Sequence, residues 1–141
     1  MKQPGYLQSA YPLRNFSERL EGFYHAVHDN GMSRSRCIIH QLSPTIDGAM
    51  ADMLAIIDRG DTLADCYFAD NDLIAIGTIK ALRLRGYKVP EQVAIVGFDN
   101  ISEGRIYRPL PYQYQHPSSL YGTGCRQRAS LSNKRTPAAY L

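Results

Sequence analysis

The stretch Asp65–Asn100, DCYFADNDLIAIGTIKALRLRGYKVPEQVAIVGFDN, decides the fold because it reads as a strand, a helix and a second strand. Asp65–Phe68 is short and rich in aromatic and apolar residues. From Leu73 onward the apolar residues recur with a helical period, and Gly86 stands where a helix C-cap is expected. Val93–Val96 is a near-continuous apolar run, as in a strand that is buried on both faces. The stretch therefore predicts a β-α-β unit.

Short polar sequences follow both predicted strands. Asn71 and Asp72 come after the first strand, and Asp99 and Asn100 come after the second. The two strands of a β-α-β unit are parallel and joined by a right-handed crossover, so both polar ends emerge at the same edge of the sheet. Because open parallel sheets bind ligands at this carboxyl edge, the sequence predicts a ligand site there.

The residues before this stretch continue the same alternation. A short strand is predicted at Gly5–Ala10, and a helix follows that Asn15 or Ser17 can cap. Next come a strand at Arg36–Leu42 and a helix that ends before Gly60. The order β-α-β-α-β-α-β predicts an α/β fold, a doubly wound parallel sheet with helices on both of its faces.

The bulk composition is that of one soluble globular domain. The chain has 141 residues, of which 44% are hydrophobic and 21% are charged. Its formal net charge of +3 neither requires nor excludes a nucleic-acid partner. No apolar run approaches the roughly 20 residues of a membrane span, and the N-terminus lacks the apolar core of a signal peptide. A cytoplasmic location without membrane association is therefore expected.

The cysteines and histidines show no metal-binding spacing. Cys37, Cys66 and Cys125 are odd in number, and no C-x-x-C pair occurs. His25 and His28 lie three residues apart on one predicted helix, where we expect them on the solvent side. No glycine-rich nucleotide-binding motif follows any predicted strand. Neither a metal nor a cofactor is expected.

Arg19 has an unusual position in the first turns of the predicted helix, between Glu18 and Glu21. A cation near a helix N-terminus interacts unfavourably with the helix dipole. Arg19 is therefore either a solvated surface residue or a residue that is placed there for a ligand. Taken alone, the local sequence favours the surface interpretation.

Three segments carry a resemblance to a known family. They are SERLEGF at 17–23, FADNDLIAIG at 68–77 and RGYKVPEQVAIVGFDN at 85–100. In order and spacing they resemble the effector-binding domain of the lactose-repressor/galactose-repressor (LacI/GalR) family of bacterial transcription regulators, over roughly residues 5–108. The resemblance implies one subdomain of a periplasmic-binding-protein-like fold, whose cleft binds a small effector, commonly a sugar or a nucleobase. It also implies a dimer or tetramer that reads DNA through a separate N-terminal helix-turn-helix.

The resemblance assigns effector binding to Arg19, Asn71 and Asp99. Arg19 matches the arginine that reaches the effector, Asn71 the asparagine or aspartate at a strand end, and Asp99 the aspartate that accepts hydrogen bonds from effector hydroxyls. An arginine donates, an aspartate accepts and an asparagine does both, so together they suit adjacent sugar hydroxyls. Structural roles stay open as well: Asp99 could be a loop cap, and Asn71 or Asp70 a helix N-cap.

The chain departs from the family pattern at both ends. It begins at what would be the first strand of the second subdomain, so we expect a fragment without the helix-turn-helix and without the other half of the cleft. The resemblance stops after Pro109. Residues 109–141 are rich in Pro, Gln, Ser, Arg and Tyr without a helical or strand period, and they predict an irregular tail.

The codons of the tail suggest an origin for this change. Residues 111–116, PYQYQH, must be encoded as CCN-TAY-CAR-TAY-CAR-CAY. Read from the second base of the proline codon, these bases permit Leu-Thr-Ser-Ile-Asn-Ile, the kind of strand that the family has here. We hypothesise that the residues from about Leu110 onward are a frameshifted translation, with a genuine divergent tail as the alternative. A gene whose bases cannot encode the family strand would contradict the frameshift.

The leading interpretation is therefore the effector-binding subdomain of a sugar-responsive transcription regulator, without catalytic activity. Its partners would be a small-molecule effector, a second copy in the full-length protein, and DNA only through the absent N-terminal domain. One alternative is a solute-binding protein of a transporter, which shares the fold but needs an export signal. The other is a small Mg²⁺-dependent enzyme using Asp70, Asp72 and Asp99, for which no nucleophile motif is present.

Overall fold

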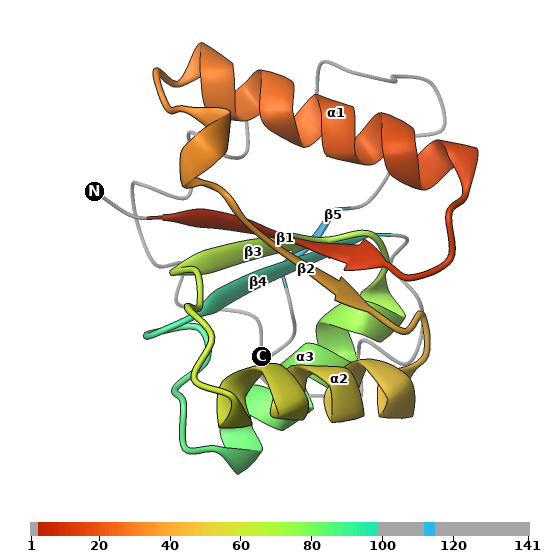
Figure 1. Cartoon of the computed structure of the whole chain (residues 1–141), viewed down its shortest axis with the longest axis vertical. Helices are drawn as coiled ribbons and strands as arrows, with labels where there is room; N and C mark the ends of the chain where they lie inside the picture. The colour runs from red at the N-terminus through yellow and green to blue at the C-terminus, as the bar shows by residue number, and fades with distance from the viewer. Residues whose placement is uncertain (1–2, 99–111, 115–141) are drawn as a thin grey trace, which may run out of the picture.

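The computed structural model of the protein describes residues 3–98 and the strand at 112–114. The predicted alternation of strands and helices is confirmed over residues 3–98 (Figure 1). The elements in chain order are β1 (Pro4–Ser9), α1 (Arg14–Asp29), the 3-10 helix η1 (Arg34–Arg36), β2 (Ile38–Leu42), α2 (Ile46–Asp58), β3 (Cys66–Ala69), α3 (Asp72–Leu84), β4 (Ala94–Phe98) and β5 (Tyr112–Tyr114).

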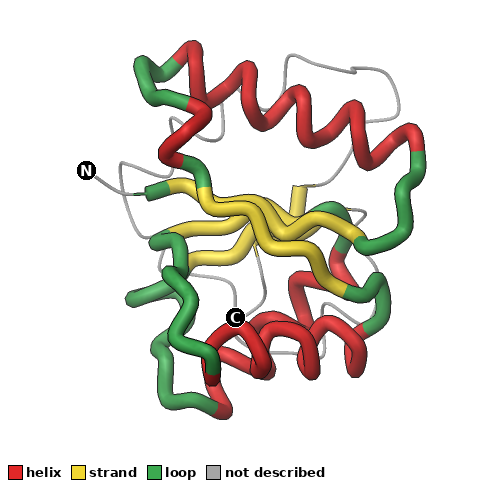
Figure 2. The backbone as a smooth tube through the Cα atoms, viewed as in Figure 1, coloured by secondary structure: helices red, strands yellow, loops and turns green. Residues whose placement is uncertain are grey.

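All described strands form one parallel sheet in the order β2-β1-β3-β4-β5. Helix α1 covers one face of the sheet, and α2 and α3 lie side by side on the other face (Figures 1 and 2). The predicted doubly wound α/β fold is therefore confirmed. Strands β2 and β3 flank β1, and the helices that follow β1 and β2 run on opposite faces. This places the topological switch point between β1 and β3.

Close packing of α2 on α3 fills the space below the sheet. The two helices meet at Gly77, where a Cβ atom would clash with the carbonyl oxygen of Ile46 and lie 2.8 Å from Cβ of Ala49. At their C-terminal ends, Arg85 donates two hydrogen bonds of 2.7 Å to the carboxylate of Asp58. The two helices therefore form one layer, in which α2 packs on β2 and α3 packs on β1, β3 and β4.

The helix ends match the predictions in part. Gly60 and Gly86 follow α2 and α3 with φ of +78° and +82°, conformations that favour glycine. The predicted capping of the first helix by Asn15 or Ser17 is wrong, because α1 already begins at Arg14 and its N-cap residue, Leu13, makes no side-chain cap bond. The backbone N–H groups of Phe16 and Ser17 instead bond to the carbonyl of Leu13.

The tail contains one described strand. We expected no strand after Pro109, and this is wrong for Tyr112–Tyr114, which pairs in parallel with β4. Three residues are too few to show a strand period, and pairing with the edge of an existing sheet depends on backbone groups rather than on side-chain pattern. The other residues of 99–141, including Asp99 and the rest of the proposed frameshift, lie outside the described residues.

The described cysteines and histidines are Cys37, Cys66, His25, His28 and His40. Cys37 and Cys66 form no disulfide with each other and are half-buried, and His25 and His28 are exposed on α1 as predicted. Among the residues that the structure describes, no group of three or more His, Cys, Asp or Glu is placed to hold a metal ion. Within the same residues, no helix has the length and apolar character needed to cross a membrane.

Candidate functional site

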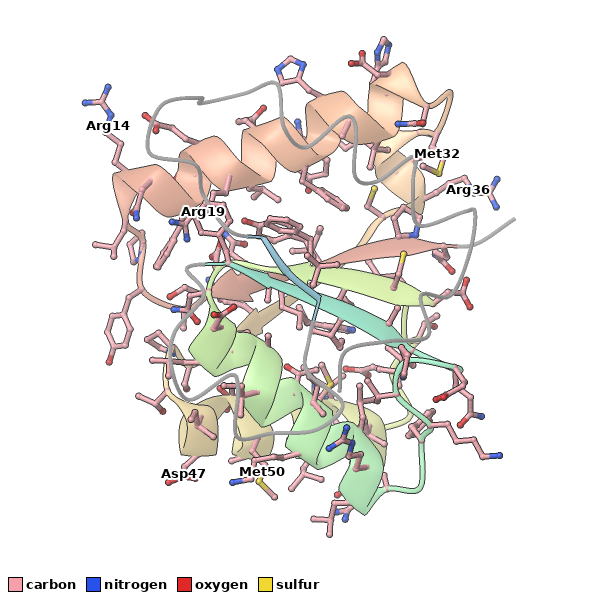
Figure 3. All side chains as sticks on the ribbon, turned by 180° about the vertical axis from the view of Figure 1, so that it is seen from behind. Arg14, Arg19, Met32, Arg36, Asp47 and Met50 are labelled. Carbon is pink, nitrogen blue, oxygen red and sulfur yellow. The ribbon has the colours of Figure 1, made fainter. Side chains whose placement is uncertain are left out.

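Arg19 reaches from α1 to the carboxyl ends of two neighbouring strands. Its Nη1 donates a hydrogen bond to the backbone carbonyl of Asp70, the residue directly after β3. Its guanidinium lies over the ring of Phe98, the last residue of β4, with 3.7 Å between the guanidinium carbon and the ring centroid. Figure 3 shows Arg19 on the side of α1 that faces the sheet. Arg19 is therefore part-buried at the predicted ligand edge rather than a freely solvated surface residue.

Asn71 is the N-cap of α3. Its Oδ1 accepts a hydrogen bond of 2.9 Å from the backbone N–H of Ile74, and its own backbone is extended. The N-cap role that the sequence left open between Asn71 and Asp70 therefore belongs to Asn71. The cap uses the side-chain oxygen, and donation to a ligand would come from the amide nitrogen. The N-terminus of α3 thus opens at the same sheet edge as Arg19.

Asp70 lies at the switch point with its carboxylate turned into the protein. The side chain is 0% exposed. Its Oδ1 accepts a hydrogen bond from the hydroxyl of Tyr6, and its Oδ2 accepts one of 2.6 Å from the backbone N–H of Ser9. Burial raises the pKa of the Asp70 carboxyl, while the bonds from Ser9 and Tyr6 and the charge of Arg19 act in the opposite direction. The phenol of Tyr6 likewise has its pKa raised, first by burial and then by Asp70.

Asp72 opens α3, where a carboxylate suits the positive end of the helix dipole. It is buried and packs against Gly97 of β4, where any Cβ atom would overlap its Oδ1. The enzyme alternative requires Asp70, Asp72 and Asp99 to share one cation. Asp70 is engaged by Tyr6 and Ser9 instead, and Asp99 lies outside the described residues.

The three predicted effector residues thus have different outcomes. The structure brings Arg19 and Asn71 to the carboxyl ends of β3 and β4, and Asp99 is the next residue after the described end of β4. Phe98 and Tyr6 were missed. Phe98 stands directly before Asp99 in GFDN, and an aromatic residue at the end of a strand was the available signal. For Tyr6 the signal was the need of a buried tyrosine hydroxyl for a hydrogen-bond partner.

The fold and this edge together define the class of protein as a doubly wound α/β domain. Such domains bind their ligands at the carboxyl edge of the sheet, where this chain has an arginine and a helix N-terminus. The sequence profile of the periplasmic binding protein-like domain matches residues 5–120, and the chain belongs to this family. The match continues past residue 108, where the quoted resemblance ends.

The relatives are LacI/GalR-family transcription regulators, which confirms the family resemblance. The HTH-type transcriptional regulator GalS from Salmonella typhimurium is 30% identical over 113 residues, covering 80% of this chain and 33% of GalS. The regulator GalR from Escherichia coli is 29% identical over 134 residues, covering 93% of this chain and 38% of GalR. The chain therefore spans about a third of the length of these relatives.

A solved structure supports the same relationship. It is a LacI family transcriptional regulator from Enterococcus faecium with bound ribose, with a TM-score of 0.69 and 25% sequence identity. The superposition covers 77% of this chain and 40% of that regulator. The fold similarity therefore extends over most of the chain and less than half of the regulator.

Proposed function

We propose that this chain supplies one wall of the effector site of a LacI/GalR-type transcription regulator, and that the effector is a sugar. The observation that carries the proposal is the position of Arg19, held between the Asp70 carbonyl and the Phe98 ring at the carboxyl ends of β3 and β4. The bound ribose in the Enterococcus faecium relative supports a sugar as the class of effector.

The residues at this edge offer the hydrogen bonds that a polyol requires. A guanidinium is a rigid fork of donors that can pair with adjacent hydroxyl oxygens. Asn71 would add an amide donor beside it, at the N-terminus of α3. Asp99, which directly follows Phe98 in the sequence, would accept from hydroxyls. The proposed set is therefore Arg19, Asn71 and Asp99, with the parts of the regulator that this chain does not span forming the opposite wall.

The proposal is binding rather than catalysis, because the relatives are transcription regulators. Such regulators respond to an effector through its different affinities for two arrangements of the protein. In the whole regulator, we expect a homodimer in which other segments read DNA. A DNA-binding regulator acts in the cytoplasm, and we expect the same location here.

Sugar-dependent melting of the 141-residue chain tests the proposal. A panel of ribose, galactose, lactose and cellobiose would be compared in thermal denaturation. A sugar at about 100 times its Kd stabilises a folded protein by about 2.7 kcal/mol, so at least one sugar should raise Tm measurably. The Arg19→Ala variant should lose this shift.

The matched control is Arg36→Ala, which removes an arginine away from Arg19, as Figure 3 shows. This variant should keep the full sugar-dependent rise in Tm. Equal shifts in both arginine variants, or no shift with any sugar of the panel, would contradict the proposed site.

A further inference from the structure

A buried carboxylate lies at the switch point of this sheet. In doubly wound sheets the ligand crevice lies outside the carboxyl ends of the strands at this point, here between β1 and β3. Asp70 directly follows β3, and its carboxylate accepts from two groups of β1, the Tyr6 hydroxyl and the Ser9 N–H. The backbone N–H of Asp70 also donates to the carbonyl of Leu7 at 3.0 Å. Asp70 therefore links the end of β3 to β1 through hydrogen bonds of both its backbone and its side chain.

The same residue holds Arg19. The backbone carbonyl of Asp70 accepts the hydrogen bond from Arg19 Nη1, and the carboxylate on that residue is fixed by Tyr6 and Ser9. Because both ends of Asp70 are fixed, the direction of its carbonyl is fixed as well. The carboxylate also attracts the guanidinium through space, since the charge of Arg19 acts to lower the pKa of Asp70 against the effect of burial.

A binding site whose arginine is already held in place binds its ligand more tightly than a site whose arginine is mobile. Ordering a long, flexible side chain such as that of arginine costs conformational entropy. A site in which this cost is met on folding binds its ligand more tightly than one in which the ligand must order the side chain. The ring of Phe98 restrains Arg19 from a second direction, at 3.7 Å.

We propose that Asp70 and Tyr6 form a positioning pair that fixes the guanidinium of Arg19 at the carboxyl edge of the sheet before any effector binds. The benefit for an effector rests on the proposed function of Arg19. The positioning itself is a property of the free chain. Neither Asp70 nor Tyr6 need touch the effector.

The test observes Arg19 directly by NMR of the ¹⁵N-labelled chain without ligand. The Nε–H signal of Arg19 is identified by its disappearance in Arg19→Lys. In the unaltered chain it should be shifted by the ring current of Phe98 and exchange slowly with water. Tyr6→Phe removes one hydroxyl oxygen and leaves the ring. The Arg19 signal should then move toward those of exposed arginines, and its exchange with water should become faster by about tenfold, the change that corresponds to losing one buried hydrogen bond.

Tyr67→Phe is the matched control. Tyr67 is as deeply buried as Tyr6, and its hydroxyl accepts a hydrogen bond of 2.9 Å from the backbone N–H of Ala64. Ala64 precedes β3, whereas Arg19 bonds to Asp70 directly after β3. This variant also loses a buried tyrosine hydroxyl, but the Arg19 signal should stay unchanged. An equal change in Tyr6→Phe and Tyr67→Phe would show a general loosening of the fold and overturn the proposal.

Asp70→Asn supplies a second, independent readout. An asparagine places an NH2 group, which cannot accept a hydrogen bond, where one carboxylate oxygen accepts from Tyr6 or from Ser9, and it also removes the negative charge that attracts Arg19. The Arg19 signal should shift in the same direction as in Tyr6→Phe. An unchanged Arg19 signal in either folded variant overturns the positioning pair.

The sugar titration keeps this proposal separate from the proposed function. A shifted Arg19 signal in both variants, with no sugar bound by any form of the chain, would support the positioning pair and contradict the effector site. Sugar binding with an Arg19 signal that neither variant moves would support the effector site and overturn the positioning pair.

Discussion

The guanidinium carbon of Arg19 lies 3.7 Å from the ring centroid of Phe98, which joins helix α1 to the end of strand β4. A second pair has the same separation, since Arg34 lies 3.7 Å from the ring of Tyr24. The two pairs differ in exposure: Arg19 is part-buried, whereas the Arg34 side chain is 65% exposed. Cation–π contacts are worth about 0.5–1 kcal/mol when exposed and about 2 kcal/mol when desolvated. We therefore expect Arg19–Phe98 to be the stronger of the two.

Two double-mutant cycles measure this difference. One combines Arg19→Ala with Phe98→Leu, and the other combines Arg34→Ala with Tyr24→Leu, each followed by urea denaturation. The coupling free energy should be about 1–2 kcal/mol for the first pair and about 0.5 kcal/mol for the second. A coupling at Arg34–Tyr24 equal to or larger than that at Arg19–Phe98 would contradict the expected effect of burial.

Gly77 sets how closely α2 and α3 approach, so a methyl group there should be costly. In Gly77→Ala the new Cβ would clash with the Ile46 carbonyl and lie 2.9 Å from the backbone nitrogen of Met50. Overpacking of this kind typically costs about 1–3 kcal/mol. Gly22→Ala is the control, because Gly22 is also helical and a Cβ there would meet nothing within 4 Å. It should raise the free energy of unfolding by about 0.5–1 kcal/mol through helix propensity. Destabilisation of similar size in both variants would mean that the contact with α2 is not the cause.

Asn71 has a structural role that must be separated from its proposed contact with the effector. Asn71→Ala removes the N-cap of α3 and should lower the free energy of unfolding by about 1 kcal/mol, measured by urea denaturation. Asn71→Asp keeps a capping oxygen and should keep most of that stability, but it lacks the amide donor. Sugar-dependent stabilisation should therefore fall in both variants. If Asn71→Asp kept the full sugar-dependent stabilisation, the role of Asn71 would be helix capping alone, without a contact to the effector.

The elements that could be predicted from the sequence are those with a local pattern. The helical period after Leu73 and the apolar run at Val93–Val96 depend on nearby residues only, and α3 and β4 lie where these patterns predict them. The placement of Arg19 at the sheet edge came from a family motif, not from its local sequence, which favoured a surface role. Its stacking on Phe98 could not be predicted because it depends on how α1 lies across the sheet.

The hydrogen bond between Tyr6 and Asp70 could not be predicted from any local sequence pattern. The two residues are 64 positions apart. Their contact depends on the register of β1 against β3, in which Tyr6 pairs with Phe68. An alternating pattern shows which residues share a face of a strand, but it does not show which residues of two strands stand side by side.

The buried carboxylate of Asp70 should make the stability of the chain depend on pH in an unusual direction. Burial raises the pKa of the Asp70 carboxyl in the folded protein above the ordinary value of 3.8. The folded state therefore binds the proton of this carboxyl more tightly than the unfolded state does. The contribution of Asp70 is therefore most favourable below the ordinary pKa, and it decreases as the pH rises through the raised pKa. The slope is at most about 1.4 kcal/mol per pH unit. Asp70→Asn cannot titrate, so the free energy of unfolding of the unaltered chain minus that of Asp70→Asn should fall from pH 4 toward neutrality.

Asp58→Asn gives the opposite sign and serves as the control for that experiment. The hydrogen bonds from Arg85 lower the pKa of the exposed Asp58 carboxyl. The stability that Asp58 contributes is present above the ordinary pKa of 3.8 and is lost as the pH falls through its lowered value. The stability of the unaltered chain relative to Asp58→Asn should therefore rise with pH, while that relative to Asp70→Asn falls. If both differences rise with pH, then the bonds from Ser9 and Tyr6 and the charge of Arg19 outweigh the burial of Asp70, and its carboxyl is ionised throughout this range.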